Sequence, residues 1–189
     1  MISNNLKISV KTALIASQEI LSIYDSYDIN FTLKEDNSPI TEADKISHET
    51  IMEGLKSTKY PILSEEGIKI KYSERKNWKK FWLIDPLDGT KEFVKRNGEF
   101  TVNIALIENE IPVLGVVYAP VSKELYFAEK NLGAFKVEGI VKFSELEKLN
   151  KIDLSKTSWP NYYTIVVSRS HMNDQTLDII EKKKRIIIK

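Results

Sequence analysis

The sequence predicts an α+β fold, because helical patterns come first and a series of short strands follows. Residues 6–24 carry apolar side chains at three- and four-residue spacing, which is typical of an amphipathic helix. Apolar runs at 100–107, 114–119, 125–128 and 134–137 are separated by short turn sequences, which predicts a meander of strands. A chain of 189 residues is long enough for one large domain with a proper core.

The N-terminal segment combines two predicted helices with a short strand. A strand is expected at Phe31–Leu33 and a turn over residues 36–39. Thr41 followed by Asp44 fits a capping box, so a second helix is expected to begin there. The inward-facing residues are expected to be Leu6, Val10, Ala13, Leu14, Ser17, Leu21 and Tyr24 in the first helix, and Ile46, Thr50, Ile51 and Leu55 in the second.

Two short apolar runs, 60–63 and 81–84, are each followed directly by acidic residues. Both runs are expected to be buried strands with carboxylates at their C-terminal ends. Further along, a strand is expected at 164–167, a helix at 173–183 and the start of another strand at 186–188.

The predicted organisation is a single domain over residues 1–189. Its N-terminal α+β part covers about 1–150, and a C-terminal α/β part begins in about 151–189. A terminal strand needs a partner for its backbone and a helix to cover it. The chain is therefore expected to stop part-way through a fold.

Composition excludes several classes of protein. Lys+Arg 28 and Asp+Glu 27 give a net charge of +1, which argues against a nucleic-acid binder. The absence of cysteine excludes disulfides, thiolate zinc sites and a cysteine nucleophile, and with only two histidines a metal must use oxygen ligands, which favours Mg²⁺. No apolar run approaches the ~20 residues of a membrane span. A cytoplasmic location is expected, and peripheral association with the inner face of the membrane stays open.

Three carboxylates follow the two buried runs: Glu65 after the first, and Asp85 and Asp88 after the second. If the two strands are close in the sheet, these side chains converge and repel one another, and a divalent cation would remove that cost. Pro86 holds Asp85 extended, and Gly89 permits a tight turn. Taken singly, each motif is also a common turn sequence.

The string Asp85-Pro86-Leu87-Asp88-Gly89-Thr90 resembles the signature of the inositol monophosphatase superfamily of Mg²⁺-dependent, lithium-sensitive phosphatases. Residues 37–44, 63–66, 85–106 and 167–171 look closest to its bacterial 3'(2'),5'-bisphosphate nucleotidase branch. The resemblance implies a layered αβαβα sandwich whose C-terminal portion is incomplete in this chain.

The resemblance also implies roles for individual residues. Glu65, Asp85 and Asp88 would be side-chain ligands of Mg²⁺, and Leu87 would contribute its carbonyl. Glu65 and Thr90 would act on the attacking water, with the Thr90 hydroxyl polarised by Asp44. Substrate contacts are expected from Glu65, Leu87, Asp88, Gly89 and Thr90.

The implied activity is removal of the 3'-phosphate of adenosine 3',5'-bisphosphate to give AMP and phosphate, in sulfate assimilation and nucleotide turnover. The family's downstream Trp-Asp motif, which supplies a further metal ligand, is not present after Arg169. Two alternatives therefore stay open. One is an inactive remnant that binds at most a metal or a partner, and the other is an inositol or sugar monophosphatase of the same superfamily.

Several other polar residues have two interpretations each. Ser64 contacts substrate or caps the strand end, and His48 is a surface or packing residue rather than a ligand. His171 is a helix-entry residue or a nucleotide contact, and Arg169 pairs with a second phosphate or with a surface carboxylate.

Basic and aromatic residues complete the set. Three basic residues beyond the metal loop either steer a doubly phosphorylated anion or face solvent: Lys91, Lys95 and Arg96. Three tryptophans are expected in the core or at an interface rather than as a stacking platform: Trp78, Trp82 and Trp159.

Overall fold

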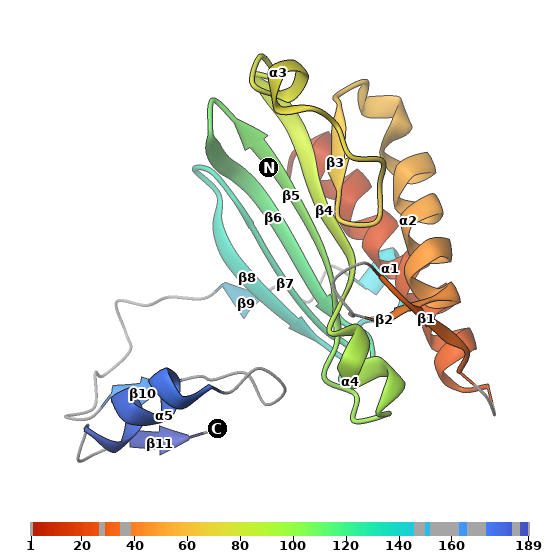
Figure 1. Cartoon of the computed structure of the whole chain (residues 1–189). Coiled ribbons are helices and arrows are strands. Elements are labelled where there is room, and N and C mark those ends of the chain that lie inside the picture. The colour runs from red at the N-terminus through yellow and green to blue at the C-terminus, as the bar shows by residue number, and fades with distance from the viewer. Residues whose placement is uncertain are drawn as a thin grey trace. The chain divides into compact units, whose positions relative to one another are not determined.

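The computed structural model describes residues 2–26, 29–34, 39–145, 150–151, 163–165, 173–182 and 186–188. It groups the chain into two compact units, Met1–Ile152 and Asp153–Lys189 (Figure 1). The α+β class expected from the sequence is confirmed, and the single-domain organisation stays a prediction.

The first unit begins with helices and continues as a sheet. Its helices and turns are α1 (Asn4–Tyr24), α2 (Glu42–Leu55), η1 (Lys56–Thr58), α3 (Tyr72–Arg75), α4 (Thr90–Val94) and η2 (Phe143–Glu145). Its strands are β1 (Phe31–Leu33), β2 (Pro39–Thr41), β3 (Ile62–Ser64), β4 (Lys80–Asp88), β5 (Thr101–Glu108), β6 (Ile111–Ala119), β7 (Glu124–Glu129), β8 (Gly133–Glu138) and β9 (Asn150–Lys151).

Within the described residues, β3 to β9 form one seven-stranded sheet in sequence order. β3 runs parallel to β4, and every later pair is antiparallel, so the predicted meander is confirmed. The parallel pair at one edge is the part that matters for the site, because it places the C-terminal end of β3 beside Ile84 of β4, directly before Asp85. β1 and β2 form a separate antiparallel hairpin.

Two helices, α1 and α2, pack on one another and cover one face of this sheet (Figure 1). The strands alternate accordingly: Trp82 and Ile84 of β4 are buried, whereas Leu83 between them is 44% exposed. Both runs form strands as expected, but the expected burial is incomplete, since β3 is a half-buried edge strand and β4 has one open face.

The start of α2 follows the predicted capping box. Thr41 is the N-cap, and its hydroxyl and backbone N–H each bond with Asp44. Ile51 and Leu55 are buried as expected, but Ile46 and Thr50 are only half-buried. The buried stripe of the helix runs instead through Ala43, Ser47, Ile51 and Leu55.

The sequence suggested that this strand ends before Asp85, but β4 continues to Asp88. Asp85 pairs with Asn103 and Asp88 pairs with Thr101, so one extra residue is accommodated between them as a bulge. Pro86 lies inside this bulge, where a residue without an N–H is tolerated in a sheet.

The second unit is described by itself. β10 (Tyr163–Ile165), α5 (Asp174–Glu181) and β11 (Ile186–Ile188) follow in order, and the two strands pair in parallel. Asn173 caps α5 by accepting a hydrogen bond from Thr176 N at 2.9 Å. The helix and the strand start expected here are confirmed. The predicted turn at 36–38, Trp159, Val167, Arg169 and His171 lie outside the described residues.

None of the helices formed by the described residues has the length and apolar character that crossing a bilayer requires.

Candidate active site

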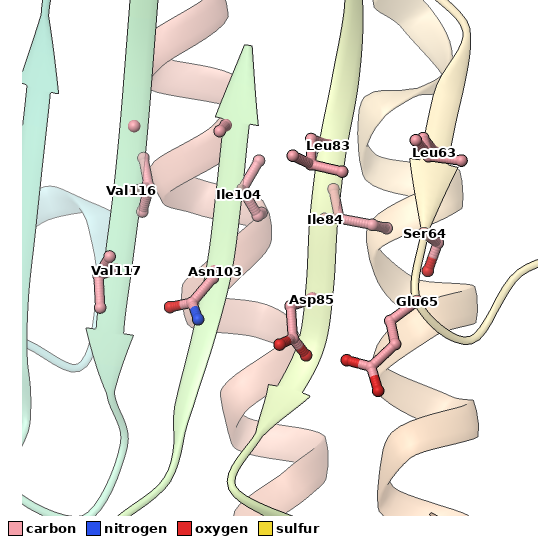
Figure 2. Close-up of a pocket in the computed structure, with 12 residues that line it drawn as sticks. Leu63, Ser64, Glu65, Leu83, Ile84, Asp85, Asn103, Ile104, Val116 and Val117 are labelled. Carbon is pink, nitrogen blue, oxygen red and sulfur yellow. The ribbon is translucent and has the colours of Figure 1, made fainter. Parts of the chain in front are cut away.

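Strand pairing brings Glu65 and Asp85 together. Ser64 of β3 is aligned with Ile84 of β4. The residues that follow them, Glu65 and Asp85, therefore lie side by side. The Glu65 N–H donates to the carbonyl oxygen of Ile84 at 3.2 Å, which holds Glu65 against β4. Figure 2 shows the Glu65 carboxylate turned toward that of Asp85.

Asp85 lies in an unfavourable electrostatic environment. Partial burial is the main cause that raises its pKa from 3.8 to about 7, and the charges of Glu65 and Asp88 add to it. A side-chain hydrogen bond with Glu65 acts in the same direction, whereas a backbone hydrogen bond with Leu87 acts against it. The two strand ends therefore concentrate negative charge at Asp85, as the sequence predicted.

Asp88 stands at the far side of the bulge and is exposed. Asn103 on β5 donates through Nδ2 to Asp88 Oδ2 at 3.1 Å, and Thr101 Oγ1 donates to Asn103 Oδ1 at 3.1 Å. These two bonds fix the orientation of the Asp88 carboxylate from the neighbouring strand. Asn103 thus has a positioning role that motif reading did not assign to it.

Asp44 and Thr90 are hydrogen-bonded, as the family resemblance implied. Thr90 Oγ1 lies 2.9 Å from Asp44 Oδ1 and 3.3 Å from the carbonyl oxygen of Leu87, and its single hydroxyl proton favours the shorter contact with the carboxylate. Asp44 Oδ2 accepts from Thr41 N at 2.7 Å and from Thr41 Oγ1 at 2.5 Å. Asp44 is fully buried, so its three hydrogen bonds replace the water that it has lost.

Gly89 makes the turn between β4 and α4 possible. Its φ of +98° is strained for any residue with a side chain, and a Cβ there would lie 2.8 Å from the carbonyl oxygen of Glu99. The glycine therefore sets the position at which Thr90 begins α4.

Lys34, just after β1, forms ion pairs with two adjacent carboxylates. Its Nζ lies 2.5 Å from Glu66 Oε1 and 3.1 Å from Glu65 Oε1. Burial alone would lower the pKa of Lys34, but the hydrogen bonds with Glu66 and Glu65 raise it above 10.5. The Glu66 side chain is only 7% exposed and Glu65 is 54% exposed, so Glu66 is the enclosed partner and Glu65 keeps an open side.

Two further α2 residues contact the strands that carry the carboxylates. Ser47 Oγ donates to the carbonyl oxygen of Pro86 at 2.7 Å, in a buried position. His48 Nδ1 lies 2.8 Å from Ser64 Oγ, so His48 is a partly buried packing residue that also forms a hydrogen bond beside the site. The Ser64 hydroxyl, at the end of β3, is thus bonded to His48.

The basic residues after the metal loop have separate positions. Lys91 lies in α4 and Lys95 directly follows that helix. Arg96 donates to the carbonyl oxygens of Tyr24, at 2.5 Å, and Ser26. It therefore holds the C-terminal end of α1, which neither interpretation of Arg96 had anticipated.

The described tryptophans are structural, as expected. Trp82 is fully buried and its Nε1 donates to Thr58 Oγ1 at 2.8 Å. Trp78 packs against Phe81 with ring centroids 5.8 Å apart.

A pocket of about 470 Å³ lies on the open face of the sheet beside these residues. Glu65, Asp85 and Asn103 form its polar part, and Leu63, Leu83 and Val117 line its apolar part (Figure 2). The carboxylates are thus accessible to a small ligand that approaches this face.

The chemistry of the carboxylates suits a hard divalent cation. Among the described residues, no three acidic or histidine side chains already converge as a metal-ligand set. The donors present are carboxylate oxygens of Glu65, Asp85 and Asp88, and the raised pKa of Asp85 reflects a crowding of negative charge that a cation would relieve. The residues present therefore fit Mg²⁺.

Comparison with known proteins identifies the class. Residues 1–187 match the inositol monophosphatase family, and the chain belongs to that family. Its fold is also that of solved members: CysQ from Bacteroides thetaiotaomicron, described as a bacterial member of the family, has a TM-score of 0.82 at 43% identity, over 97% of this chain and 71% of that one.

The curated relatives of the chain include 3'(2'),5'-bisphosphate nucleotidases. The 3'(2'),5'-bisphosphate nucleotidase CysQ of Salmonella typhimurium is 42% identical over 170 residues, which cover 88% of this chain and 64% of that protein. The protein of the same name from Buchnera aphidicola is 43% identical over 173 residues, covering 90% and 61% respectively. The chain thus spans less than two thirds of the length of these two relatives.

A more distant structure shares the fold. An IMPase/NADP phosphatase complexed with Mg²⁺ and phosphate has a TM-score of 0.68 at 22% identity, over 91% of this chain and 61% of that one. At this identity the likeness concerns the fold alone.

Sequence reasoning missed three residues that hold the site together: Lys34, Ser47 and Asn103. A signal existed for Ser47, because it lies three residues after Asp44 and so falls on the same face of the helix. Lys34 is 31 residues away from its partner Glu65, and Asn103 is 15 residues away from its partner Asp88. No local sequence pattern indicates either contact.

Proposed function

We propose that this chain carries the site of a Mg²⁺-dependent phosphomonoesterase that removes the 3'-phosphate of adenosine 3',5'-bisphosphate. The observation that carries the proposal is the approach of Glu65 to Asp85 at one edge of the sheet, where the charge of Asp88 also acts on Asp85. Thr90, the partner of Asp44, lies just beyond Asp88 along the chain. The identity of 42–43% to two CysQ nucleotidases supports the choice of substrate.

Glu65, Asp85, Asp88 and the carbonyl oxygen of Leu87 would hold Mg²⁺. When bound, the metal would neutralise charge on the phosphoryl oxygens and make the attacking water more acidic. The carboxylates bind a cation only when deprotonated, so Asp85 would hold Mg²⁺ in its ionised form.

Thr90 is the group that orients the attacking water. Because its hydroxyl proton is donated to Asp44 Oδ1, the lone pairs of Thr90 Oγ1 are left to accept a hydrogen from water. The water oxygen then has a lone pair directed away from Thr90 and toward phosphorus. Glu65, with its exposed carboxylate, accepts the proton that the water loses.

The proposed reaction joins the water oxygen to phosphorus and breaks the bond between phosphorus and the 3'-oxygen. The 3'-oxygen takes up a proton from solvent water and leaves as the hydroxyl of AMP, the phosphoryl group leaves as inorganic phosphate, and Glu65 returns its proton to solvent. Gly89 and Thr90 would offer backbone N–H groups to the phosphate. The proposed partner is therefore a small nucleotide bisphosphate, and the cytoplasm stays the predicted location.

The test is phosphate release from adenosine 3',5'-bisphosphate in the presence and absence of Mg²⁺. Asp88→Asn is expected to abolish the Mg²⁺-dependent release while the melting temperature stays within a few degrees, because Asp88 is exposed and loses only its charge. Asp178→Asn is the control, since Asp178 is an exposed residue of α5 that pairs with Lys182. Retained release in Asp88→Asn would contradict the metal assignment.

Substrate choice is tested with inositol 1-phosphate and a sugar phosphate under the same conditions. Faster release from either of these would replace the nucleotide proposal with an inositol or sugar monophosphatase. Mg²⁺ binding without release from any of the three would identify a non-catalytic metal-binding chain.

A further inference from the structure

Helix α2 contacts each of the three chain segments that make up the site. Asp44 bonds with Thr90 at the start of α4, Ser47 bonds with Pro86 in the bulge of β4, and His48 bonds with Ser64 at the end of β3. Residues 44, 47 and 48 are three and four apart, so they share one face of the helix. The mechanism above uses the first of these contacts and leaves the His48 contact without a role.

The His48–Ser64 contact is made at the residue directly before Glu65. His48 Nδ1 lies 2.8 Å from Ser64 Oγ in a partly buried position. The carbonyl oxygen of Ser64 also accepts a hydrogen bond from Gly67 N at 3.2 Å, which closes the turn after the strand. Ser64 is therefore held through its side chain by α2 and through its backbone by the following turn.

Besides these contacts, the end of β3 is held by the Glu65 N–H bond to the carbonyl oxygen of Ile84 and by the ion pairs of Lys34 with Glu65 and Glu66. The strand has three residues and lies at the edge of the sheet, with β4 as its neighbour in the sheet. Short edge strands open locally at low free-energy cost. Glu65 extends from this end toward Asp85 (Figure 2), and its own backbone bond to Ile84 O is 3.2 Å long. Small movements of Ser64 would therefore move the Glu65 carboxylate.

Gly67 provides independent evidence that this corner is tightly built. A Cβ added at Gly67 would lie 3.3 Å from Ser64 Cβ and 3.7 Å from His48 Cε1. The space between the turn and the hydrogen-bonded pair is therefore little wider than one methyl group. Ser64, His48 and Gly67 form one compact unit behind Glu65.

We propose that His48 is a positioning residue, which acts through Ser64 to hold the Glu65 carboxylate where it can bind a divalent cation together with Asp85. The inference rests on the proposed function, because it concerns the same metal site. Groups that orient metal ligands from behind typically change metal affinity by about 10–100-fold when removed.

The first measurement is Mg²⁺ binding to the full chain by titration calorimetry. His48→Ala and Ser64→Ala are each expected to weaken Mg²⁺ binding about tenfold. The double variant is expected to be no weaker than either single variant, since both remove the same hydrogen bond. His48→Asn, whose amide lies near the position of Nδ1, is expected to recover most of the affinity, whereas His48→Gln is not. Ser57→Ala, at an exposed serine just beyond the same helix, is the control.

The second measurement needs no metal. Amide hydrogen exchange at Glu65 and Gly67 in the metal-free chain is expected to be at least about tenfold faster in His48→Ala than in the parent, because the strand end opens more easily. Exchange at Val116, in the middle of the sheet, is expected to be unchanged. A uniform acceleration across the sheet would show a merely structural role and overturn the proposal.

The outcomes separate this inference from the proposed function. If Asp85→Asn loses Mg²⁺ binding while His48→Ala keeps it, the metal site stands and the positioning role is refuted. If the parent chain binds no Mg²⁺, the proposed function fails, and the exchange at Glu65 still decides whether His48 holds the strand end. Additive effects of His48→Ala and Ser64→Ala would also refute the proposal.

Discussion

Replacing Asp85 with asparagine is expected to stabilise the metal-free chain and, at the same time, to remove its response to Mg²⁺. The carboxylate lies beside Glu65 and near Asp88, and burial together with these charges raises its pKa to about 7. Asparagine keeps the shape of the side chain and removes the charge. The variant therefore shows separately how much the clustered charge destabilises the metal-free chain and how much it contributes to Mg²⁺ binding.

The magnitude follows from the pKa values of Asp85 in the two states. A change from 3.8 in the unfolded chain to about 7 in the fold corresponds to about 4 kcal/mol, and screening by solvent at this partly exposed group reduces it to about 1–2 kcal/mol. The folded state binds more protons than the unfolded state between these two pKa values. Stability of the parent chain therefore falls as the pH rises from about 4 to about 7.

The assay is thermal unfolding of parent and variant at pH 4 and pH 8, with and without Mg²⁺. At pH 8 and without metal, Asp85→Asn is expected to melt about 2–8 °C higher than the parent, and at pH 4 this difference should vanish. Mg²⁺ at ten times its Kd should stabilise the parent by about 1.4 kcal/mol and leave the variant unchanged.

The control is Glu110→Gln, at an exposed carboxylate in the turn before β6, which should show neither effect. Two results would refute the reasoning. One is a lower melting temperature of Asp85→Asn at pH 8, which would mean that the charge is already compensated in the metal-free fold. The other is an equal stabilisation of parent and variant by Mg²⁺.

Three further predictions concern neighbouring positions. Gly89→Ala should lower the free energy of unfolding by about 2–3 kcal/mol, seen in thermal unfolding, because φ is positive and the new Cβ meets Glu99 O. Thr90→Val should reduce phosphate release at least about 100-fold and Thr90→Ser should retain most of it, since serine keeps the hydroxyl bonded to Asp44. Arg96→Ala should lower the free energy of unfolding by about 1 kcal/mol and leave Mg²⁺ affinity unchanged by calorimetry, because Arg96 holds the end of α1.

Local patterns in the sequence were enough to predict the longer helices, the meander of strands and one contact of the site. The spacing of Thr41 and Asp44 predicted the start of α2, and the structure has the reciprocal hydrogen bonds of that cap. Acidic residues placed after two apolar runs predicted that Glu65 and Asp85 would meet, which parallel pairing of β3 and β4 brings about. These features depend on neighbours in sequence, so they are visible there.

Other features depend on the partner strand or helix and were missed for that reason. The bulge that carries β4 past Asp85 is defined by its pairing with β5, and a turn-like sequence gives no sign of that pairing. The burial of α2 was predicted correctly at Ile51 and Leu55 but missed at the start of the helix, because there the buried stripe follows small residues, Ala43 and Ser47. Polar contacts such as that of Lys34 with Glu66 have no sequence period at all.

The two aspartates that lie deepest in the site show how environment separates their roles. Asp44 is fully buried, yet it accepts three hydrogen bonds from Thr41 and Thr90, so its charge is matched by donors within the fold. Asp85 has a favourable backbone hydrogen bond with Leu87 but faces the charges of Glu65 and Asp88. A carboxylate satisfied by the protein can orient a neighbour but has little to gain from a cation, whereas one left in repulsion gains most from it. The same residue type is therefore expected to position Thr90 at one place and to bind Mg²⁺ at the other.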